Sequence, residues 1–130
     1  MVDAAPSRLK PEFARKLREW RKGRGWRQCD LSWKVDLSPA YIGQIERCQV
    51  PPPANEFIVG MAEALNVSPD IALAAAGRVA DDVAEIIGRH PLEMTRLVRA
   101  VGNLDLLGSQ VCDQITYLAD SLEATVRASG

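Results

Sequence analysis

The side chains between residues 38 and 47 combine an amide, a phenol and a cation, and their spacing gathers them on one face of a helix. Ile42 and Ile45 lie three residues apart and would face the core. The residues left on the outward face include no carboxylate: Pro39, Ala40, Tyr41, Gly43, Gln44 and Arg47. A helix fits the major groove of DNA, where amide and hydroxyl groups bond base edges. Gln44 is the strongest candidate, because its amide can donate and accept toward adenine at once.

Two short helices joined by a tight turn would position these side chains. Leu31 and Val35 would face inward from the first helix, expected over residues 27–35. The second helix, expected over 39–47, would begin at Ser38-Pro39. A serine hydroxyl can accept a bond from a free backbone N–H, and proline suits the first helical position. The start of the second helix is therefore specified by its own residues.

These helices carry a family pattern, formed by Gln28, Leu31, Leu37-Ser38-Pro39, Tyr41-Ile42 and Gln44-Ile45-Glu46-Arg47. The pattern resembles the helix-turn-helix of Xre/Cro/CI-type (lambda-repressor-like) bacterial and phage regulators. Residues 61–68 resemble the fourth helix and following turn of the same domain, and the likeness spans roughly residues 10–76. Three positions depart from the family. Arg27 stands where a serine or threonine cap is usual, and Asp36 and Cys48 stand where glycine often follows a helix.

The resemblance also implies which residues hold the DNA backbone. In the family the residue at the position of Gln28 commonly clamps it, and a helix N-terminus favours a phosphate. The loop after the recognition helix runs along the backbone in the family, which adds Gln49. Arg27, Lys34 and Arg47 are further candidates for phosphate contacts, which set register without reading sequence. The expected DNA-binding residues are Arg27, Gln28, Lys34, Ser38, Pro39, Ala40, Tyr41, Gln44, Arg47 and Gln49.

The charge of the chain is divided unequally between its two halves. The net charge is −1, but residues 1–53 carry 11 Lys and Arg against 6 Asp and Glu, which is +5. Residues 54–130 carry 5 against 11, which is −6. This asymmetry indicates a basic surface for a polyanion and an acidic half with another task.

The N-terminal part predicts an all-α, five-helix DNA-binding domain over residues 8–77. Besides the two central helices, the pattern predicts helices over 11–22, 55–65 and 69–76. In the first of these, Phe13, Leu17 and Trp20 would face the core. The opposite, solvent-facing side would carry Arg15, Lys16, Arg18, Arg21 and Lys22.

Residues 78–130 predict a small helical dimerisation region of about three helices, over 79–88, 92–101 and 109–127. A core of this size buries too little surface to be stable alone, so packing against a second copy is the simplest remedy. The last helix carries an apolar stripe with spacings close to those of a coiled-coil seam. The expected dimerisation residues from this stripe are Val111, Ile115, Leu118 and Leu122.

Several classes of protein fit the composition poorly. No apolar run approaches the roughly 20 residues of a membrane helix, and residues 1–16 lack the apolar segment of a signal peptide. The three cysteines are far apart and one histidine accompanies them, so we expect buried or half-buried free thiols and no metal or other cofactor. No catalytic triad, phosphate loop or carboxylate pair indicates an enzyme. We expect a cytoplasmic, nucleoid-associated protein.

These patterns predict a homodimeric transcriptional repressor that binds double-stranded DNA. Two recognition helices spaced by about one DNA turn, roughly 34 Å, predict an inverted-repeat operator. One alternative is an antitoxin or a protease-cleaved repressor, whose C-terminal half binds a toxin or a protease and whose residues 103–109 form an exposed segment. A second alternative is a protein-interaction module with the same helices and no DNA binding.

Overall fold

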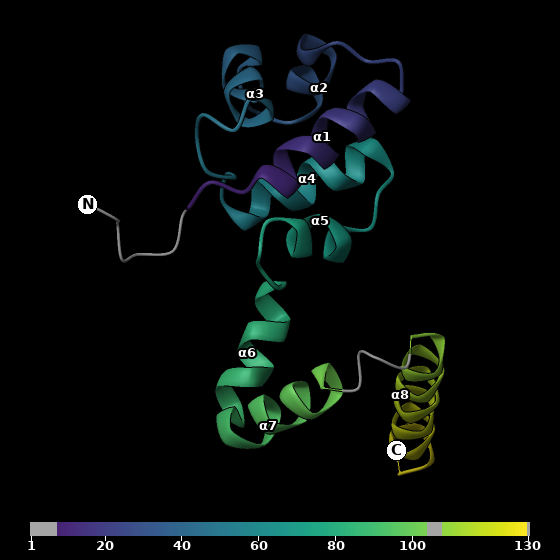
Figure 1. Cartoon of the computed structure of the whole chain (residues 1–130). Helices are drawn as coiled ribbons and strands as arrows, with labels where there is room; N and C mark the ends of the chain where they lie inside the picture. The colour runs from purple at the N-terminus through teal and green to yellow at the C-terminus, as the bar shows by residue number, and fades with distance from the viewer. Residues whose placement is uncertain (1–7, 104–107, 130) are drawn as a thin grey trace, which may run out of the picture. The chain divides into compact units, whose positions relative to one another are not determined.

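The computed structural model describes residues 8–103 and 108–129, and the described part is helical without strands (Figure 1). The predicted all-α class is therefore confirmed. The helices are α1 Pro11–Gly23, α2 Gln28–Lys34, α3 Pro39–Glu46, α4 Asn55–Leu65, α5 Pro69–Ala75, α6 Asp81–Arg89, α7 Pro91–Gly102 and α8 Ser109–Ser129. No described helix is both long enough and apolar enough to cross a bilayer.

The chain divides into two compact units, an N-terminal unit of residues 1–84 and a C-terminal unit of residues 85–130. The N-terminal unit contains α1 to α5 and the start of α6. The C-terminal unit contains the end of α6 together with α7 and α8. The expected division into residues 8–77 and 78–130 stays a prediction.

The N-terminal unit has one apolar core, to which each of its first five helices contributes. The largest side chains that are almost completely buried are Phe13, Leu17, Leu31, Ile42, Ile45, Ile58, Met61 and Leu73. Helix α1 packs against α3 and α5, and α4 packs against α2 and α5 (Figure 1). The two helices of the helix-turn-helix are therefore held on their core-facing sides, α3 by α1 and α2 by α4.

The two serine–proline pairs behave differently, although their sequences are alike. At the start of α3 the Oγ of Ser38 accepts a hydrogen bond from the backbone N–H of Tyr41 at 3.1 Å. At the start of α5 the side chain of Ser68 makes no such bond. Proline occupies the first helical position in both helices. The predicted cap is therefore present at the start of α3, where its contribution is about 1 kcal/mol.

The three departures from the family pattern have different structural outcomes. Arg27 offers no acceptor, but the carboxylate of Asp30 accepts the backbone N–H of Arg27 at 2.7 Å and so supplies half of a capping box. Asp36 does not adopt a left-handed backbone, and Val35 before it ends α2 in an extended conformation. Cys48 has φ +56°, the left-handed conformation that glycine adopts most easily. Its N–H and that of Gln49 close the end of α3 on the carbonyls of Ile45 and Gln44, at 3.0 and 2.9 Å.

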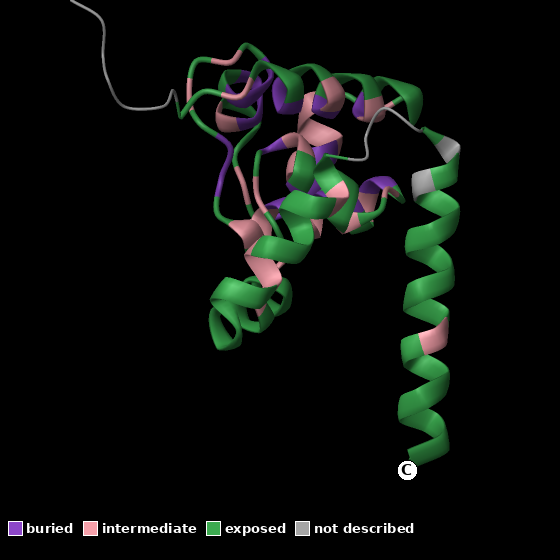
Figure 2. Ribbon diagram, turned by 60° about the horizontal axis from the view of Figure 1, so that its bottom comes forward, coloured by how far each residue is buried: buried purple, intermediate pink, exposed green. Residues whose placement is uncertain are grey.

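The C-terminal unit lacks a core within the described residues. Helices α6 and α7 contain no buried residue, and α8 is exposed along almost its whole described length (Figure 2). Ile115, Leu118 and Leu122 are 44%, 48% and 58% exposed. The side chain of Val111 and residues 104–107 of the suspected exposed segment lie outside the described part.

Candidate nucleic-acid interface

The outward face of α3 carries the predicted base-reading side chains. Pro39, Ala40 and Gln44 are exposed, whereas Ile42 and Ile45 are 0% and 1% exposed and anchor the helix in the core. The ring of Tyr41 is half-buried against the same core. Gln44 is therefore available to a ligand, and Tyr41 keeps only part of its surface for one.

A buried ion pair fixes the C-terminal end of α3 to α1. The guanidinium of Arg21 donates to both carboxylate oxygens of Glu46, from Nε at 2.6 Å and from Nη2 at 2.8 Å. Its Nη1 donates to the backbone carbonyl of Trp26 at 2.7 Å. The side chains of Arg21 and Glu46 are only 8% and 2% exposed. The hydrogen bond to Glu46 raises the pKa of Arg21 above its ordinary value, so this guanidinium stays charged although it is buried.

The expectation that Arg21 faces solvent with the other cations of α1 is wrong. Arg21 follows Leu17 by four residues and continues the buried stripe that begins at Phe13. The reason is its partner, because Glu46 satisfies the charge and most of the donors of the guanidinium inside the fold. The other four cations, Arg15, Lys16, Arg18 and Lys22, are exposed or half-buried.

Gln28 belongs to the same network and is held against α3. Its Nε2 donates to Oε1 of Glu46 at 3.2 Å, which leaves a second N–H and the amide oxygen for other partners. Gly43 makes room for this arrangement. A Cβ at that position would lie 3.2 Å from Oε1 of Gln28 and 2.9 Å from Nη1 of Arg47. Gln28 and Arg47 therefore approach each other over Gly43, on the surface that α2 and α3 share.

The remaining predicted phosphate contacts lie at the ends of the two helices. Arg47 and Gln49 are exposed, and Nε of Arg47 donates to Oε1 of Gln49 at 3.4 Å. Arg27, at the start of α2, forms an ion pair with Asp30 at 3.3 Å that lowers the pKa of the Asp30 carboxyl. Lys34, at the end of α2, places its Nζ 5.0 Å from the centre of the Trp26 ring. Arg47 is thus bonded to a neutral amide, whereas Arg27 shares its charge with a carboxylate.

Two residues behind this surface were not predicted from the sequence: Glu46 holds Gln28 in place, and Gly43, expected on the outward face, is buried. The signal for Glu46 was its place next to Ile45, on the inward side of α3. The signal for Gly43 was a glycine in the middle of a short helix, where it costs about 1 kcal/mol of helix propensity and is favoured only if a neighbouring side chain needs the space.

One expectation about the thiols is also wrong, since Cys112 is exposed, whereas Cys29 and Cys48 are half-buried and free.

Comparison with known proteins identifies the family of the chain. The sequence model of the helix-turn-helix domain matches residues 12–76, which is half of the chain. The chain belongs to the helix-turn-helix domain family. This membership supports a DNA-binding transcription regulator. No curated protein matches the chain.

Solved structures of two regulators are similar to this helix-turn-helix protein. The hypothetical transcription factor NHTF from Neisseria is 29% identical with a TM-score of 0.46, over 56% of this chain and 86% of that chain. The clp gene regulator ClgR from Corynebacterium glutamicum matches in two structures. One is 25% identical with a TM-score of 0.47, over 56% of this chain and 92% of that chain. The other is 20% identical with a TM-score of 0.48, over 72% and 92%.

Proposed function

We propose that this protein is a sequence-specific transcriptional repressor of the Xre/Cro/CI type, which binds an inverted-repeat operator as a homodimer and has no catalytic activity. The observation that carries this proposal is the state of α3. Its inward residues Ile42, Ile45 and Glu46 are buried and fixed, whereas Gln44 on the other side is exposed. A rigid helix with an unoccupied amide is suited to reading bases in the major groove.

Within this proposal Gln44 reads a base pair through both groups of its amide. Tyr41 contributes its phenol, and the exposed Pro39 and Ala40 offer apolar contact at the start of the helix. Ser38 keeps the start in place through its cap. Repression follows from occupation of promoter DNA, which requires no chemical step.

The proposed phosphate contacts lie on both sides of α3. Gln28 retains one N–H after its bond to Glu46 and can donate it to a phosphate at the start of α2. Arg47 and Gln49 would bind at the end of α3, and Arg27 and Lys34 at the two ends of α2. These contacts position the protein without reading the sequence.

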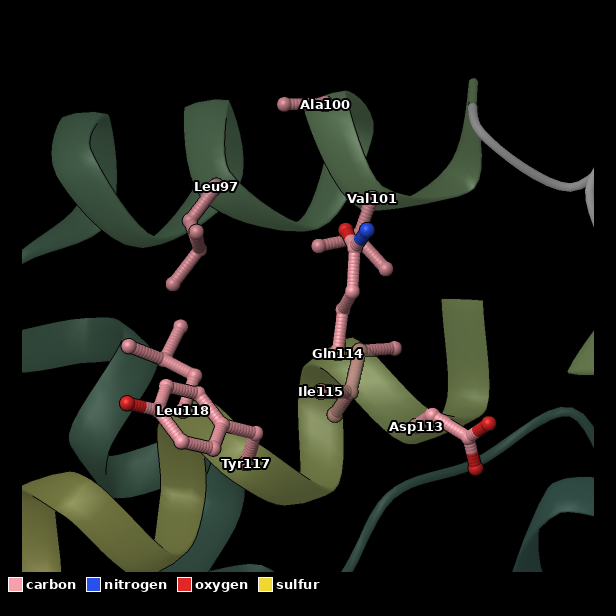
Figure 3. A pocket seen from close by; sticks show the side chains of 8 residues that line it. All are labelled: Leu97, Ala100, Val101, Asp113, Gln114, Ile115, Tyr117 and Leu118. Carbon is pink, nitrogen blue, oxygen red and sulfur yellow. The ribbon is translucent and has the colours of Figure 1, made fainter. Parts of the chain in front are cut away.

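The C-terminal unit supports the homodimer. A groove of about 600 Å³ lies between α7 and α8 and is largely apolar. Figure 3 shows Leu97 and Val101 of α7 pointing toward Leu118 and Ile115 of α8. Farther along α8, Leu122 and Val126 lie outside this groove and are 58% and 72% exposed. A second copy that packed on this surface would bury the apolar side chains that the described monomer leaves in water.

The charge pattern of α8 fits the same partner. Of its four charged residues, Asp120 and Arg127 fall on the side away from Ile115, Leu118 and Leu122, whereas Asp113 lines the groove and Glu123 lies at the edge of the apolar stripe. The apolar side is bordered by small or uncharged residues, including Ala119 and Ser121. A wide uncharged stripe of this kind suits a bundle of helices better than a narrow two-helix seam. A stable interface needs about 800 Å² from each partner, so the dimer contact should extend over both α7 and α8.

The reading role of Gln44 is tested by comparing two glutamine variants on selected operator DNA and on random DNA. Gln44→Ala should lose about 1–3 kcal/mol of discrimination at one base pair, because one bidentate contact disappears. Gln49→Ala removes the same group from an expected phosphate contact, so its loss should be equal on both DNAs. Equal losses for Gln44→Ala would contradict base reading by Gln44.

The dimer is tested by sedimentation of two variants of α8. Leu118→Asp places a charge in the apolar stripe and should give a monomer that protects one half-site. Thr116→Asp places the same charge on the already charged side of α8 and should remain dimeric. A wild-type chain that sediments as a monomer at every concentration used for DNA binding would refute the homodimer.

A further inference from the structure

A second basic surface lies on α1, apart from the reading face of α3. Helices α1 and α3 pack against each other (Figure 1), and a groove of about 440 Å³ runs between α1 and the end of α3. We call it the α1 groove. Its lining residues are Pro11, Ala14, Arg15, Arg18, Glu19, Lys22, Glu46, Arg47 and Cys48.

The two carboxylates of the α1 groove are neutralised by other partners. Glu19 accepts a hydrogen bond from Arg15 at 2.6 Å, and Arg15 also binds Glu12 at 2.8 Å. The carboxylate of Glu46 is occupied by the buried guanidinium of Arg21. These carboxylates therefore offer little negative charge to repel an anion in the groove.

Three cations of the groove keep their charge unneutralised. Arg18 and Lys22 are exposed, lie one turn apart on α1, and form no ion pair within the described part of the chain. Arg47 is bonded to the neutral amide of Gln49. The α1 groove is thus a cationic surface that favours an anionic ligand.

The α1 groove is continuous with the expected phosphate contacts through Arg47. The guanidinium of Arg47 lies close to Gly43 and Gln28 on one side, and the same side chain lines the groove on the other. Residues at i and i+4 of a helix, such as Arg18 and Lys22, lie about 6 Å apart. Phosphates recur along one DNA strand every 3.4 Å or so of the helix axis, so two cations about 6 Å apart span more than one repeat and can contact different phosphates.

We propose that the α1 groove is a further binding site for the DNA backbone, in which Arg18 and Lys22 contact phosphates next to those held by Gln28 and Arg47. This inference rests on the proposed function, because it concerns the same DNA duplex. Helix α1 would then bind the DNA backbone directly, in addition to packing its apolar side against the core. The contribution is electrostatic and independent of base sequence.

The test compares the salt dependence of DNA binding for three full-length chains. Each lost phosphate contact lowers the log–log slope by about 0.9. Arg18→Ala/Lys22→Ala should therefore reduce the slope by about 1.8 for each bound subunit, or about 3.6 for the homodimer, on selected and on random duplexes alike, with the ratio of the two affinities unchanged. The control Arg89→Ala/Arg127→Ala removes the same charge from helices outside the groove, where both arginines are paired with neighbouring glutamates, and should leave the slope unchanged.

The outcomes separate this inference from the proposed function. An unchanged slope for Arg18→Ala/Lys22→Ala, with wild-type binding intact, would overturn the role of the groove and leave the reading helix unaffected. Failure of the wild-type chain to bind any duplex at low salt would overturn both proposals. If the alanine variant melted at a lower temperature, Arg18→Gln/Lys22→Gln, which keeps the side-chain stems, should give the same change of slope at unchanged stability.

Discussion

The ion pair between Arg21 and Glu46 gives the strongest stability prediction for this fold. Removal of one partner of a buried pair costs about 3–5 kcal/mol, because the other charge is left buried and unpaired. Arg21→Met keeps an unbranched apolar stem of similar reach to the arginine stem, removes the guanidinium, and leaves the Glu46 carboxylate with Gln28 as its remaining side-chain donor. Glu46→Leu leaves the guanidinium with the Trp26 carbonyl alone. Each single variant should therefore lose most of the stability of a small domain.

The double variant Arg21→Met/Glu46→Leu should be far more stable than the sum of the single changes. It removes both charges together, and apolar residues of similar size often replace a buried pair without loss. The carbonyl of Trp26 and the amide of Gln28 would each lose a hydrogen bond worth about 1 kcal/mol. We therefore expect a cost of about 2 kcal/mol for the double variant, against about 6–10 kcal/mol for the summed single changes.

Urea denaturation followed by circular dichroism measures these free energies of unfolding. The control cycle uses Arg15→Met and Glu19→Leu, a pair whose side chains are 54% and 58% exposed. Solvent screens that pair, so its two changes should be additive. Additive losses at Arg21 and Glu46 as well, or single variants as stable as those of the control, would refute the reasoning.

Three further predictions concern single positions. Gly43→Ala should weaken binding to every DNA sequence, although alanine gains about 1 kcal/mol of helix propensity there, because the new Cβ displaces Arg47 and Gln28. Gly60→Ala, whose Cβ meets nothing closer than 3.9 Å, should leave binding unchanged. Cys48→Gly should raise the free energy of unfolding by about 0.5–1 kcal/mol in thermal denaturation, since the left-handed backbone costs about 1–2 kcal/mol and the flexibility of glycine offsets part of the gain. The hydrogen bond from Arg27 lowers the pKa of Asp30 below its ordinary value of 3.8. The ion pair therefore stabilises the folded state at pH values above 3.8, and this stabilisation is lost as the pH falls through the lowered pKa of Asp30. Asp30→Asn should accordingly flatten the acid limb of the stability curve, and a carboxyl titration by NMR would contradict this if Asp30 titrated at or above 3.8.

The sequence predicted the helices well because most of their signals are local. Apolar residues at helical spacing placed Phe13 and Leu17 in the core, and Ser38 capped the helix that it precedes. Local signals failed where a distant residue decides the outcome. Arg21 continues the apolar stripe of α1, but its burial depends on Glu46, which lies 25 residues later in the chain.

The expected site was predicted in part for the same reason. The exposure of Gln44 follows from the positions of Ile42 and Ile45 on one helix, so it could be read from spacing. The bond between Gln28 and Glu46 joins two helices, and the proximity of Arg47 to Gln28 depends on the missing side chain of Gly43. No periodicity within one helix contains that information. The roles of these residues on DNA stay predictions.

The alternation of fixed and exposed positions along α3 has a consequence for how such proteins change. The residues that hold the helix, at positions 42, 45 and 46, are separate from the exposed ones at 39, 40 and 44. Substitution at the exposed three alters no packed atom of the core, so under the proposed function a change of DNA preference need not reduce the stability of the fold. A library randomised at these three codons should consist largely of folded members with diverse preferences, which makes this scaffold a starting point for engineered switches.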